Sequence, residues 1–389
     1  MLKKTAILLL VLSFTLSYSQ KLKLSVYSDV SIITSGPGEE LYEKFGHTAI
    51  RIKDPLLKLD LIYNYGIFDF SAPNFYLKFI KGFMNYKLAR YDFYRALKIA
   101  NNEERWVKEQ VLNLTTEEKN AFFYFLESNA ETKNASYSYD PYFNNCATKP
   151  RDIIKEVLGN KLAFASDSIT HKKSLRQLMN VEIHTNTWGN FGINIALGNK
   201  LDKIATAEQA MYLPDYVYKV VQASNIKRDD TNTPLVKKVN HLIQFDEKKS
   251  KASYYGPFSI FSFLLLISIY ITYKDYVNKK RTKYLDFILF FITGIIGMLI
   301  AFLWLFTNHS TAPNNFNFLW AFAPNLFVSF YMFKENPPKW ISKYILILLV
   351  LIIIIAPIIW VSGIQLFSPY LSILLLLLSI RYLYLYKKL

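Results

Sequence analysis

The distribution of apolar and polar positions divides the chain into an apolar start, a mixed central part and a strongly apolar end. Residues 21–255 alternate charges, aromatics and short apolar runs, which is typical of a soluble globular domain. Beyond Gly256, long apolar segments separated by short polar loops predict five helices that cross a membrane. These segments are 258–273, 285–306, 316–333, 344–364 and 367–385.

The first twenty residues have the pattern of a secretory signal peptide. Lys3 and Lys4 precede an apolar run, and small residues follow it before Gln20. A retained anchor is the alternative, although the run is short for a stable span. We therefore expect a signal peptide at 1–19, an exported domain at 20–225, a basic linker at 226–256 and a five-helix transmembrane domain at 257–389.

Basic residues predict the orientation in the membrane, because Lys and Arg are retained on the cytoplasmic side of short loops. They are concentrated in the loops after the first and third apolar segments and in the C-terminal tail. The other two loops carry no Lys or Arg. The pattern predicts an inner-membrane protein with a periplasmic N-terminal domain and a cytoplasmic C-terminus.

The formal net charge of +16 does not change this interpretation. Part of it comes from the cytoplasmic loops and much of the rest from 226–256, and an exported domain meets no nucleic acid. A basic linker above a bilayer could bind anionic headgroups or be a solvated spacer. The apolar segments contain almost no ionisable side chain away from their ends, which argues against transport. Neither a metal-binding cluster nor a cofactor motif is found in the sequence.

Cys146 is the only cysteine in the chain and is either a small core residue or a nucleophile. It precedes an amphipathic segment, 151–158, that predicts a helix with Cys146 in its first turn. The free N–H groups and positive dipole end of such a turn favour a thiolate. Asn145 could cap this helix.

A thiolate nucleophile needs a base that exchanges protons near neutral pH, and histidine suits this role. His47 opens a predicted strand at 45–52, with Ala49 and Arg51 on the same face. We therefore expect His47 and Cys146 to form a catalytic pair. The exported domain has three further histidines. His171 and His241 have basic, polar neighbours, which is typical of a solvated surface, whereas the role of His184 is undecided.

Four other residues are weaker candidates for the site. Asn64 could orient His47 as the third member of a triad. Arg51 and Arg151 could bind a headgroup phosphate or pair with carboxylates. His309, in an uncharged loop on the periplasmic side, is either an interfacial residue or a second element of the site.

The order of histidine before cysteine resembles circularly permuted papain-like folds such as the lecithin:retinol acyltransferase type. In those folds an Asn-Cys dipeptide also opens the nucleophile helix, as at Asn145 and Cys146 here. This resemblance implies a permuted papain-like α+β fold for the exported domain. We expect an additional helical region at 160–224 and, after it, an all-α membrane domain of about five helices.

A second resemblance covers nearly the whole chain and concerns the Lnb-type lipoprotein N-acyltransferases of the Bacteroidetes. It rests on FGHTAIR at 45–51, YGIFDF at 65–70, NCAT at 145–148, FGINIALG at 191–198, TNH at 307–309 and NFNFLW at 315–320. Pro150 and Asn194 depart from the expected pattern.

The Lnb resemblance implies a thiol acyltransferase with His47 and Cys146 as its functional pair. The acyl donor would be a membrane phospholipid and the acceptor a diacylated lipoprotein. The alternatives are a membrane-tethered cysteine peptidase or cell-wall amidase that uses the same pair, and a non-catalytic scaffold in which Cys146 only packs.

Overall fold

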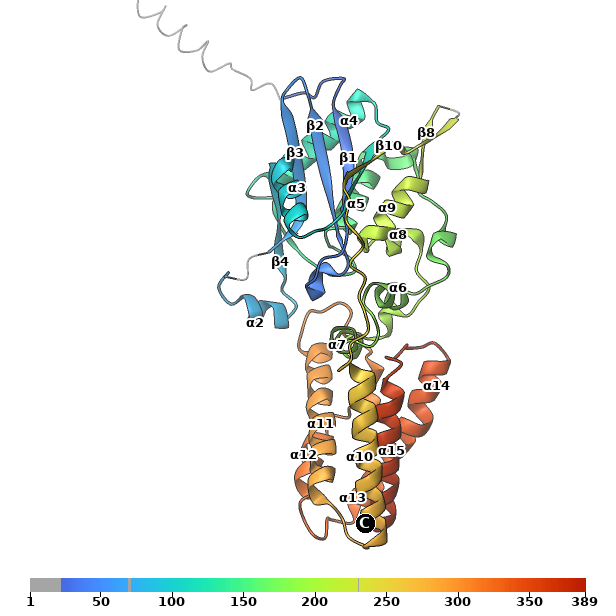
Figure 1. Ribbon diagram of the computed structural model, residues 1–389. Coiled ribbons are helices and arrows are strands. Elements are labelled where there is room, and N and C mark those ends of the chain that lie inside the picture. Colours follow the sequence, from blue (N-terminus) through green and yellow to red (C-terminus); the bar gives the residue numbers. More distant parts are fainter. Residues whose placement is uncertain (1–21, 69–70, 230) are drawn as a thin grey trace, which may run out of the picture.

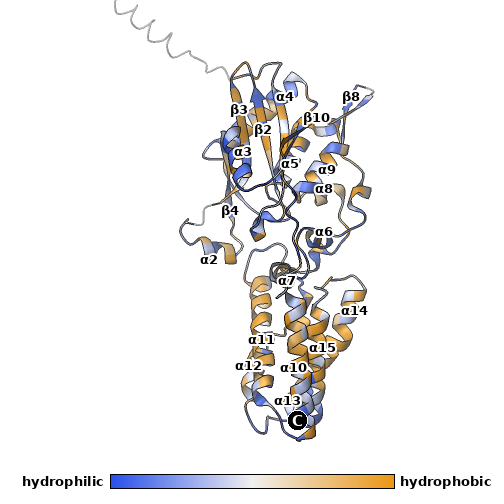
Figure 2. Ribbon diagram, in the orientation of Figure 1, coloured by the Kyte–Doolittle hydropathy of each residue, from blue (hydrophilic) through white to orange (hydrophobic). Residues whose placement is uncertain are grey.

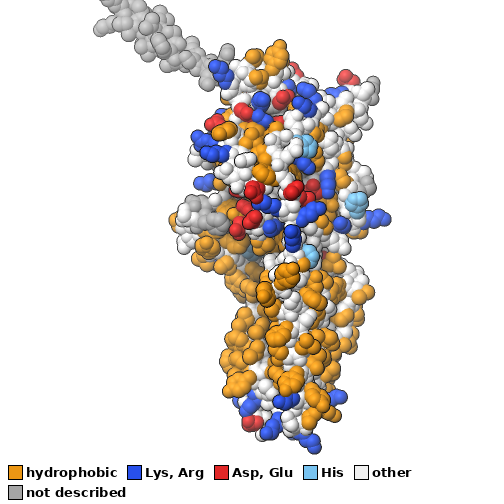
Figure 3. Space-filling model, viewed as in Figure 1, with side chains coloured by type: hydrophobic (Ala, Val, Ile, Leu, Met, Phe, Trp, Pro, Cys, Tyr) orange, Lys and Arg blue, Asp and Glu red, His pale blue; other side chains and the backbone are white. Residues whose placement is uncertain are grey.

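The computed structural model describes residues 22–68, 71–229 and 231–389. The predicted signal peptide at 1–19 lies outside these residues. An α+β domain sits at one end of a bundle of helices (Figure 1). The helices of the bundle are apolar along their length (Figure 2), and hydrophobic side chains cover the visible face of the bundle (Figure 3).

Among the described residues, seven strands form one antiparallel sheet in the order β10-β5-β1-β2-β3-β4-β6. The central strands β1 and β2 are buried on both faces, although several of their buried residues are polar or charged. The strands are β1 (Asp29–Ser35), β2 (His47–Asp54), β3 (Leu59–Ile67), β4 (Asn85–Asp92), β5 (Val107–Leu112), β6 (Ser136–Ser138) and β10 (Val236–Ile243).

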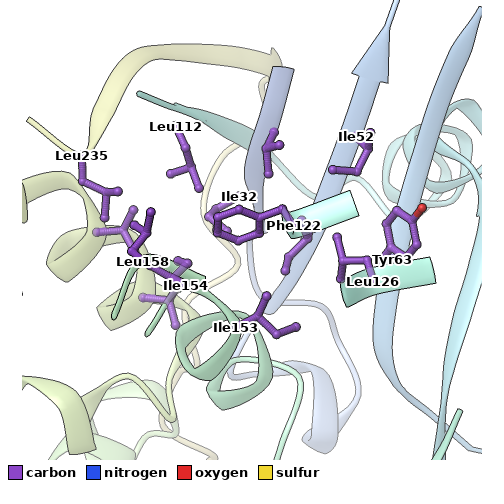
Figure 4. Close-up of a cluster of buried hydrophobic side chains, with 14 of the residues drawn as sticks. Ile32, Ile52, Tyr63, Leu112, Phe122, Leu126, Ile153, Ile154, Leu158 and Leu235 are labelled. Atoms are coloured by element: carbon purple, nitrogen blue, oxygen red, sulfur yellow. The ribbon is translucent and has the colours of Figure 1, made fainter. Parts of the chain in front are cut away.

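Helices cover both faces of this sheet. The main core lies between the sheet and α4 (Thr116–Ala130), α5 (Thr148–Leu158) and α9 (Pro214–Ala223). Figure 4 shows Ile32 and Ile52 of the sheet in one cluster with Phe122 and Leu126 of α4 and Ile153 and Ile154 of α5. Helix α3 (Phe93–Asn102) packs a smaller cluster onto the other face.

The helical region expected at 160–224 is present and forms the side of the domain nearest the bundle. It contains α6 (Leu175–Glu182), α7 (Trp188–Ala196) and α8 (Ala207–Ala210) as well as α9. A small sheet of β7 (Leu162–Ala163), β8 (Asn225–Arg228) and β9 (Thr231–Pro234) flanks it. Helix α2 (Phe75–Ile80) projects separately, at the level where the bundle begins (Figure 1).

The basic linker predicted at 226–256 is wrong over its first half. Strands β8, β9 and β10 lie within this half, and β10 pairs with β5 at the edge of the main sheet. Edge strands commonly carry Lys, and this makes them resemble a polar spacer in sequence. Arg228 of this segment pairs with Glu118 at 2.5 Å. The remaining residues, 244–256, lead to the first helix of the bundle without regular structure.

The membrane part begins with two long helices, α10 (Pro257–Val277) and α11 (Lys283–Leu305). The later elements are a 3-10 turn, Phe316–Leu319, α12 (Asn325–Tyr331), α13 (Trp340–Val350), a π-helical turn, Leu351–Ile355, α14 (Ala356–Val361) and α15 (Leu371–Lys388). In the described part of the chain, three helices are long and apolar enough to cross a membrane: Pro257–Val277, Lys283–Leu305 and Trp340–Val361.

The prediction of five continuous helices therefore needs correction at the third segment, 316–333. Pro324 cannot continue a helix, and the Asn315 side chain accepts the backbone N–H of Asn317, so polar groups replace the helical bonds. The result is a turn followed by the short helix α12. In the fourth segment, Pro357 lacks an N–H, which accounts for the π-helical turn directly before it.

Amide side chains join the two parts of the molecule at α7. Asn317 donates to the Asn194 carbonyl at 3.0 Å, and Asn315 donates to the Ile195 carbonyl at 2.6 Å. The Gly198 N–H also donates to Thr311 O at 2.8 Å. The far end of the bundle carries the C-terminus and basic side chains (Figures 1 and 3).

Candidate functional site

The structure places the imidazole of His47 and the thiol of Cys146 beside each other, close enough for each to shift the pKa of the other. His47 is the first residue of β2, and Cys146 lies directly before α5, which packs against the core face of the sheet. Both residues are half-buried. Cys146 is a free thiol. A strand end and a helix start, far apart in sequence, thus place a nucleophile beside a base.

The turn that carries Cys146 is held by Asn145. Its Oδ1 accepts the N–H groups of Ala147 and Thr148, both at 2.9 Å, so Asn145 caps the helix as predicted. Its Nδ2 donates to the carbonyls of Pro141 at 2.7 Å and Tyr212 at 2.9 Å. Helix α5 begins at Thr148, so Cys146 precedes the first turn instead of lying within it. Asn145 is only 5 % exposed, and its hydrogen bonds fix the turn next to Cys146.

Strand β3 passes close to Cys146 at Gly66. A Cβ at this position would lie 3.3 Å from the Cys146 Cβ and 3.7 Å from the Tyr139 ring, and the φ of +94° also favours glycine. The pKa of Tyr139 is raised well above its usual value, mostly by burial and to a lesser extent by the negative charge of Cys146. Tyr139 therefore remains neutral beside the thiol.

The pKa of the Cys146 thiol is lowered. Burial by itself raises it, but the charge of His47, its hydrogen bond to the sulfur and the backbone N–H groups of Thr48 and Cys146 together outweigh burial. These groups all stabilise the thiolate. Cys146 therefore forms a thiolate more readily than an ordinary cysteine does.

The pKa of His47 is raised. Burial acts to lower it, but the Cys146 charge and hydrogen bonds with Cys146 and Asn64 outweigh burial. His47 Nε2 lies 2.6 Å from Asn64 Oδ1, and Asn64 Nδ2 donates to Tyr91 Oη at 2.9 Å. Because an amide oxygen can only accept, Nε2 carries the proton. Nδ1 is then the ring nitrogen available to Cys146.

Arg51 lies within the sheet and is satisfied by carboxylates. It forms two bonds with Asp60, both at 2.7 Å, and one with Glu109 at 2.9 Å, and its guanidinium lies 4.0 Å from the centre of the Phe93 ring. The structure thus favours the carboxylate pairing over the phosphate site.

Arg151 and His309 also bind within the protein. Arg151 pairs with Asp152 at 2.7 Å and donates to Glu208 O at 3.0 Å. His309 Nε2 lies 3.2 Å from Ile80 O, at the end of α2. His309 is therefore an interfacial contact between the domain and the membrane part.

Three groups around His47 and Cys146 were not predicted from the sequence: the Thr48 N–H, Tyr139 and, through Asn64, Tyr91. The Thr48 N–H carries no side-chain signal, and Tyr91 and Tyr139 come from β4 and from the loop before Cys146. Their positions depend on strand pairing. Among the described residues, no group of three His, Cys, Asp or Glu could hold a metal ion.

A thiolate next to a proton-carrying imidazole can attack a carbonyl carbon and protonate the leaving group. The chemistry that this arrangement supports is covalent acyl transfer or hydrolysis through a thioester. The Asn64 amide that contacts the imidazole adds no charge to this arrangement.

Two family models match the chain. The Lnb N-terminal periplasmic domain matches residues 17–180, and the Lnb transmembrane domain, a model named for five transmembrane helices, matches residues 248–389. No curated protein and no solved structure matches the chain. The two models cover most of the chain and occur in the expected order. The chain therefore belongs to the Lnb family.

Proposed function

We propose that this protein is a lipoprotein N-acyltransferase that moves a fatty acyl group from a membrane phospholipid, through a Cys146 thioester, to the α-amine of a diacylglyceryl-cysteine lipoprotein. The observation that carries the proposal is the hydrogen-bonded pair of Cys146 and His47, with a lowered thiol pKa and a raised imidazole pKa. Membership in the Lnb family and the attached membrane helices support a lipid substrate.

In the first step, the Cys146 thiolate attacks the carbonyl carbon of a phospholipid ester. The carbon–oxygen ester bond breaks, and the leaving alkoxide takes the proton of the His47 imidazolium to give a lysophospholipid. The acyl group remains on Cys146 as a thioester. Asn64 keeps the imidazole in the required tautomer throughout.

In the second step, the lipoprotein α-amine attacks the thioester, and neutral His47 accepts the proton that the amine loses. The carbon–sulfur bond breaks, and an amide and the Cys146 thiolate result. An α-amine with a pKa near ~8 is partly neutral at pH 7 and therefore nucleophilic. The thioester must meanwhile be kept from water, which a site close to a bilayer favours.

A developing oxyanion needs a donor close to the attacking sulfur. The N–H groups of Ala147 and Thr148 are occupied by Asn145 Oδ1. The Cys146 N–H, which already acts on the sulfur, is the remaining donor at the start of α5 that we assign to this role.

In the proposed arrangement, a permuted papain-like domain faces the periplasm above the inner membrane. The basic end of the bundle and the C-terminus then lie in the cytoplasm, as the positive-inside rule requires. The diacylated lipoprotein and the donor phospholipid would both reach Cys146 from the periplasmic leaflet.

The test is N-acylation of a diacylated lipoprotein peptide by the full-length protein in phospholipid nanodiscs, followed by mass spectrometry of the peptide. We expect one added acyl amide with wild type and none with Cys146→Ser. Cleavage of the peptide or of a soluble amide, with no acyl gain, would instead identify a cysteine peptidase or amidase. Equal results for wild type and Cys146→Ser would leave only a scaffold role.

A further inference from the structure

Helix α2 and the turn after it expose an unusually apolar surface. In the described structure α2 has no buried residue, although four of its six residues are large and apolar or aromatic with side chains exposed by 46 % or more. We call these residues, together with Phe83, the α2 patch: Tyr76 (68 % exposed), Leu77 (52 %), Phe79 (46 %), Ile80 (48 %) and Phe83 (56 %). Contiguous apolar surface of this kind marks a binding site for a protein, a ligand or a membrane.

The membrane part holds the α2 patch in place. The Asn308 N–H donates to Lys81 O at 2.9 Å, and His309 Nε2 lies 3.2 Å from Ile80 O. Gly82 permits this contact, because a Cβ there would lie 2.8 Å from His309 N and its φ is +78°. The end of α2 is therefore fixed to the 307–309 loop.

This loop follows directly on a membrane-spanning helix. Helix α11 ends at Leu305, and the exposed fractions of Leu305 and Phe306 are 67 % and 72 %, as expected for side chains that face lipid. Because α2 is bonded to residues two and three positions after Phe306, the α2 patch lies at the depth where the hydrocarbon layer meets the headgroups. Figure 1 shows α2 beside this end of the bundle.

Two lysines, one in α2 and one directly after it, also fit a phospholipid surface. Lys78 and Lys81 are exposed between the aromatic positions. Aromatic and aliphatic side chains alongside lysines are the composition of interfacial helices, which insert their apolar side chains and hold anionic headgroups with their amines.

A row of aromatic rings joins the α2 patch to Cys146. Ring centres are 6.2 Å apart from Phe79 to Phe75, 6.1 Å from Phe75 to Phe68, 5.0 Å from Phe68 to Tyr86 and 4.2 Å from Tyr86 to Tyr139. The Tyr139 ring ends the row beside Gly66, which in turn lies against Cys146. Neighbouring aromatic rings thus lead from the α2 patch to the residues beside Cys146.

We propose that the α2 patch inserts into the periplasmic leaflet and that a donor phospholipid passes from this leaflet along the aromatic row to Cys146. The leaflet contact stands on the exposed residues and their anchorage alone. The passage of the donor rests on the proposed function, because it requires a lipid ester to react at Cys146.

The leaflet contact can be measured without any activity. Since Cys146 is the only cysteine, Cys146→Ser provides a background in which Phe83→Cys is labelled with a nitroxide in anionic phospholipid nanodiscs. The control label is Tyr94→Cys on α3, at a residue that is 72 % exposed. We expect the label at 83 to collide more with oxygen than with a water-soluble nickel complex, and the label at 94 to do the reverse. A label at 83 as accessible to nickel as that at 94 overturns the leaflet contact.

The passage of the donor is tested with two substrates and the variant Leu77→Asp/Phe83→Asp. We expect formation of the Cys146 thioester from long-chain phospholipid in vesicles to slow at least about tenfold, because the charged patch no longer inserts. Thioester formation from a short-chain, water-soluble phospholipid and alkylation of Cys146 should stay at wild-type levels. Tyr94→Asp should change neither reaction.

The outcomes separate this inference from the proposed function. An equal loss of thioester formation with both substrates would mean that the variant damages the site. No loss of thioester formation with vesicles would mean that the donor enters elsewhere. Either result overturns the proposed passage. If wild type forms no thioester with either lipid, the proposed function and the passage both fail, while the nitroxide result still decides the leaflet contact.

Discussion

The reactivity of Cys146 depends on His47, since the imidazolium and its hydrogen bond are the largest of the effects that oppose burial and lower the thiol pKa. His47→Ala removes both and raises that pKa. At pH 7 the thiolate fraction, and with it the rate of alkylation by iodoacetamide, should fall about tenfold for each unit of the rise. Intact-mass measurement of the alkylated full-length protein follows the rate. His241→Ala, at an exposed position on β10, should leave it unchanged.

The same pair predicts a bell-shaped pH dependence of acyl transfer. The rate should fall below the lowered pKa of Cys146, where the thiolate is protonated, and above the raised pKa of His47, where the imidazolium is lost. His47→Ala should move the acidic limb of the alkylation profile to higher pH. An acidic limb at the same pH in both proteins would contradict a thiolate stabilised by His47.

Asn64 should act as a positioning residue for His47 and not as a proton carrier. Asn64→Ala removes the acceptor of Nε2 and should lower the acyl-transfer rate by about tenfold or more. Tyr91→Phe, which removes only the hydroxyl that holds Asn64, should cost less. The thioester-forming rate of each variant across pH is the measurement. A wild-type rate for Asn64→Ala would assign the orientation of His47 to another group.

At the residue scale, His47, Cys146 and the cap residue Asn145 could be predicted from the sequence, but the residues around them could not. Cys146, Asn145 and His47 each have a local signal: an Asn-Cys dipeptide before an amphipathic helix, and a histidine that opens a strand. Tyr91 has no such signal, because it reaches Asn64 only through the pairing of β3 with β4. Arg51 and Arg151 could be assigned to carboxylates only once the partners were placed.

At the scale of single elements, the start of α5 should tolerate change poorly. Asn145→Ala removes an N-cap, worth about 1 kcal/mol, and leaves the part-buried carbonyl of Pro141 and the buried carbonyl of Tyr212 without this donor, so the total loss should exceed ~2 kcal/mol. Thermal unfolding of the full chain in detergent measures it. Thr115→Ala, which removes the cap of α4, is the matched control and should destabilise less without slowing alkylation of Cys146.

An ion-pair cluster ties together three helices at the far end of the bundle. Arg381 of α15 is fully buried and pairs with Asp286 of α11 at 2.6 Å and Asp275 of α10 at 2.8 Å. Arg381→Leu leaves two buried carboxylates without this partner and should cost about 3–5 kcal/mol. Melting temperature in detergent is the measurement. Adding Asp275→Asn and Asp286→Asn should recover part of the loss, and Lys387→Leu, at an exposed position, should be neutral.

Single helices and strands show which features the hydropathy pattern cannot predict. Apolar runs located α10, α11 and α15 well, but run length alone could not reveal the break at Pro324 in the third segment. Arg381, near the end of the fifth predicted segment, had no predicted role inside the bundle, whereas the structure uses it in the ion-pair cluster. Strand β10 was missed because half of its side chains are polar, so its pairing with β5 left no apolar alternation.

At the scale of the whole molecule, the fit between the domain and the bundle should control access to Cys146. Gly198→Ala places a Cβ 1.9 Å from Pro313 O, so the junction must shift. We expect faster proteolysis between residues 244 and 256 and slower thioester formation. Gly192→Ala on α7 meets no atom within 4 Å and is the matched control. Wild-type protease resistance for Gly198→Ala would mean that the junction is not a rigid contact.

The order of domain and membrane part could be predicted from hydropathy alone, since it needs only local composition. How the two parts dock could not, because docking depends on the buried amides of Asn315 and Asn317, which donate to backbone carbonyls of α7. Asn194 departs from the expected pattern, and here its side chain accepts from the buried Arg176 at 3.1 Å. An amide at this position joins a network whose charge is already balanced by Asp202.

Whether Cys146 carries the acyl group can be measured as the intact mass of the full-length protein after incubation with phospholipid alone. We expect an added mass of one fatty acyl group on wild type, released by hydroxylamine and by a lipoprotein N-terminal peptide, and absent from Cys146→Ser. A folded wild-type protein that reacts with iodoacetamide at Cys146 but never gains an acyl group would show that Cys146 is not the acyl carrier.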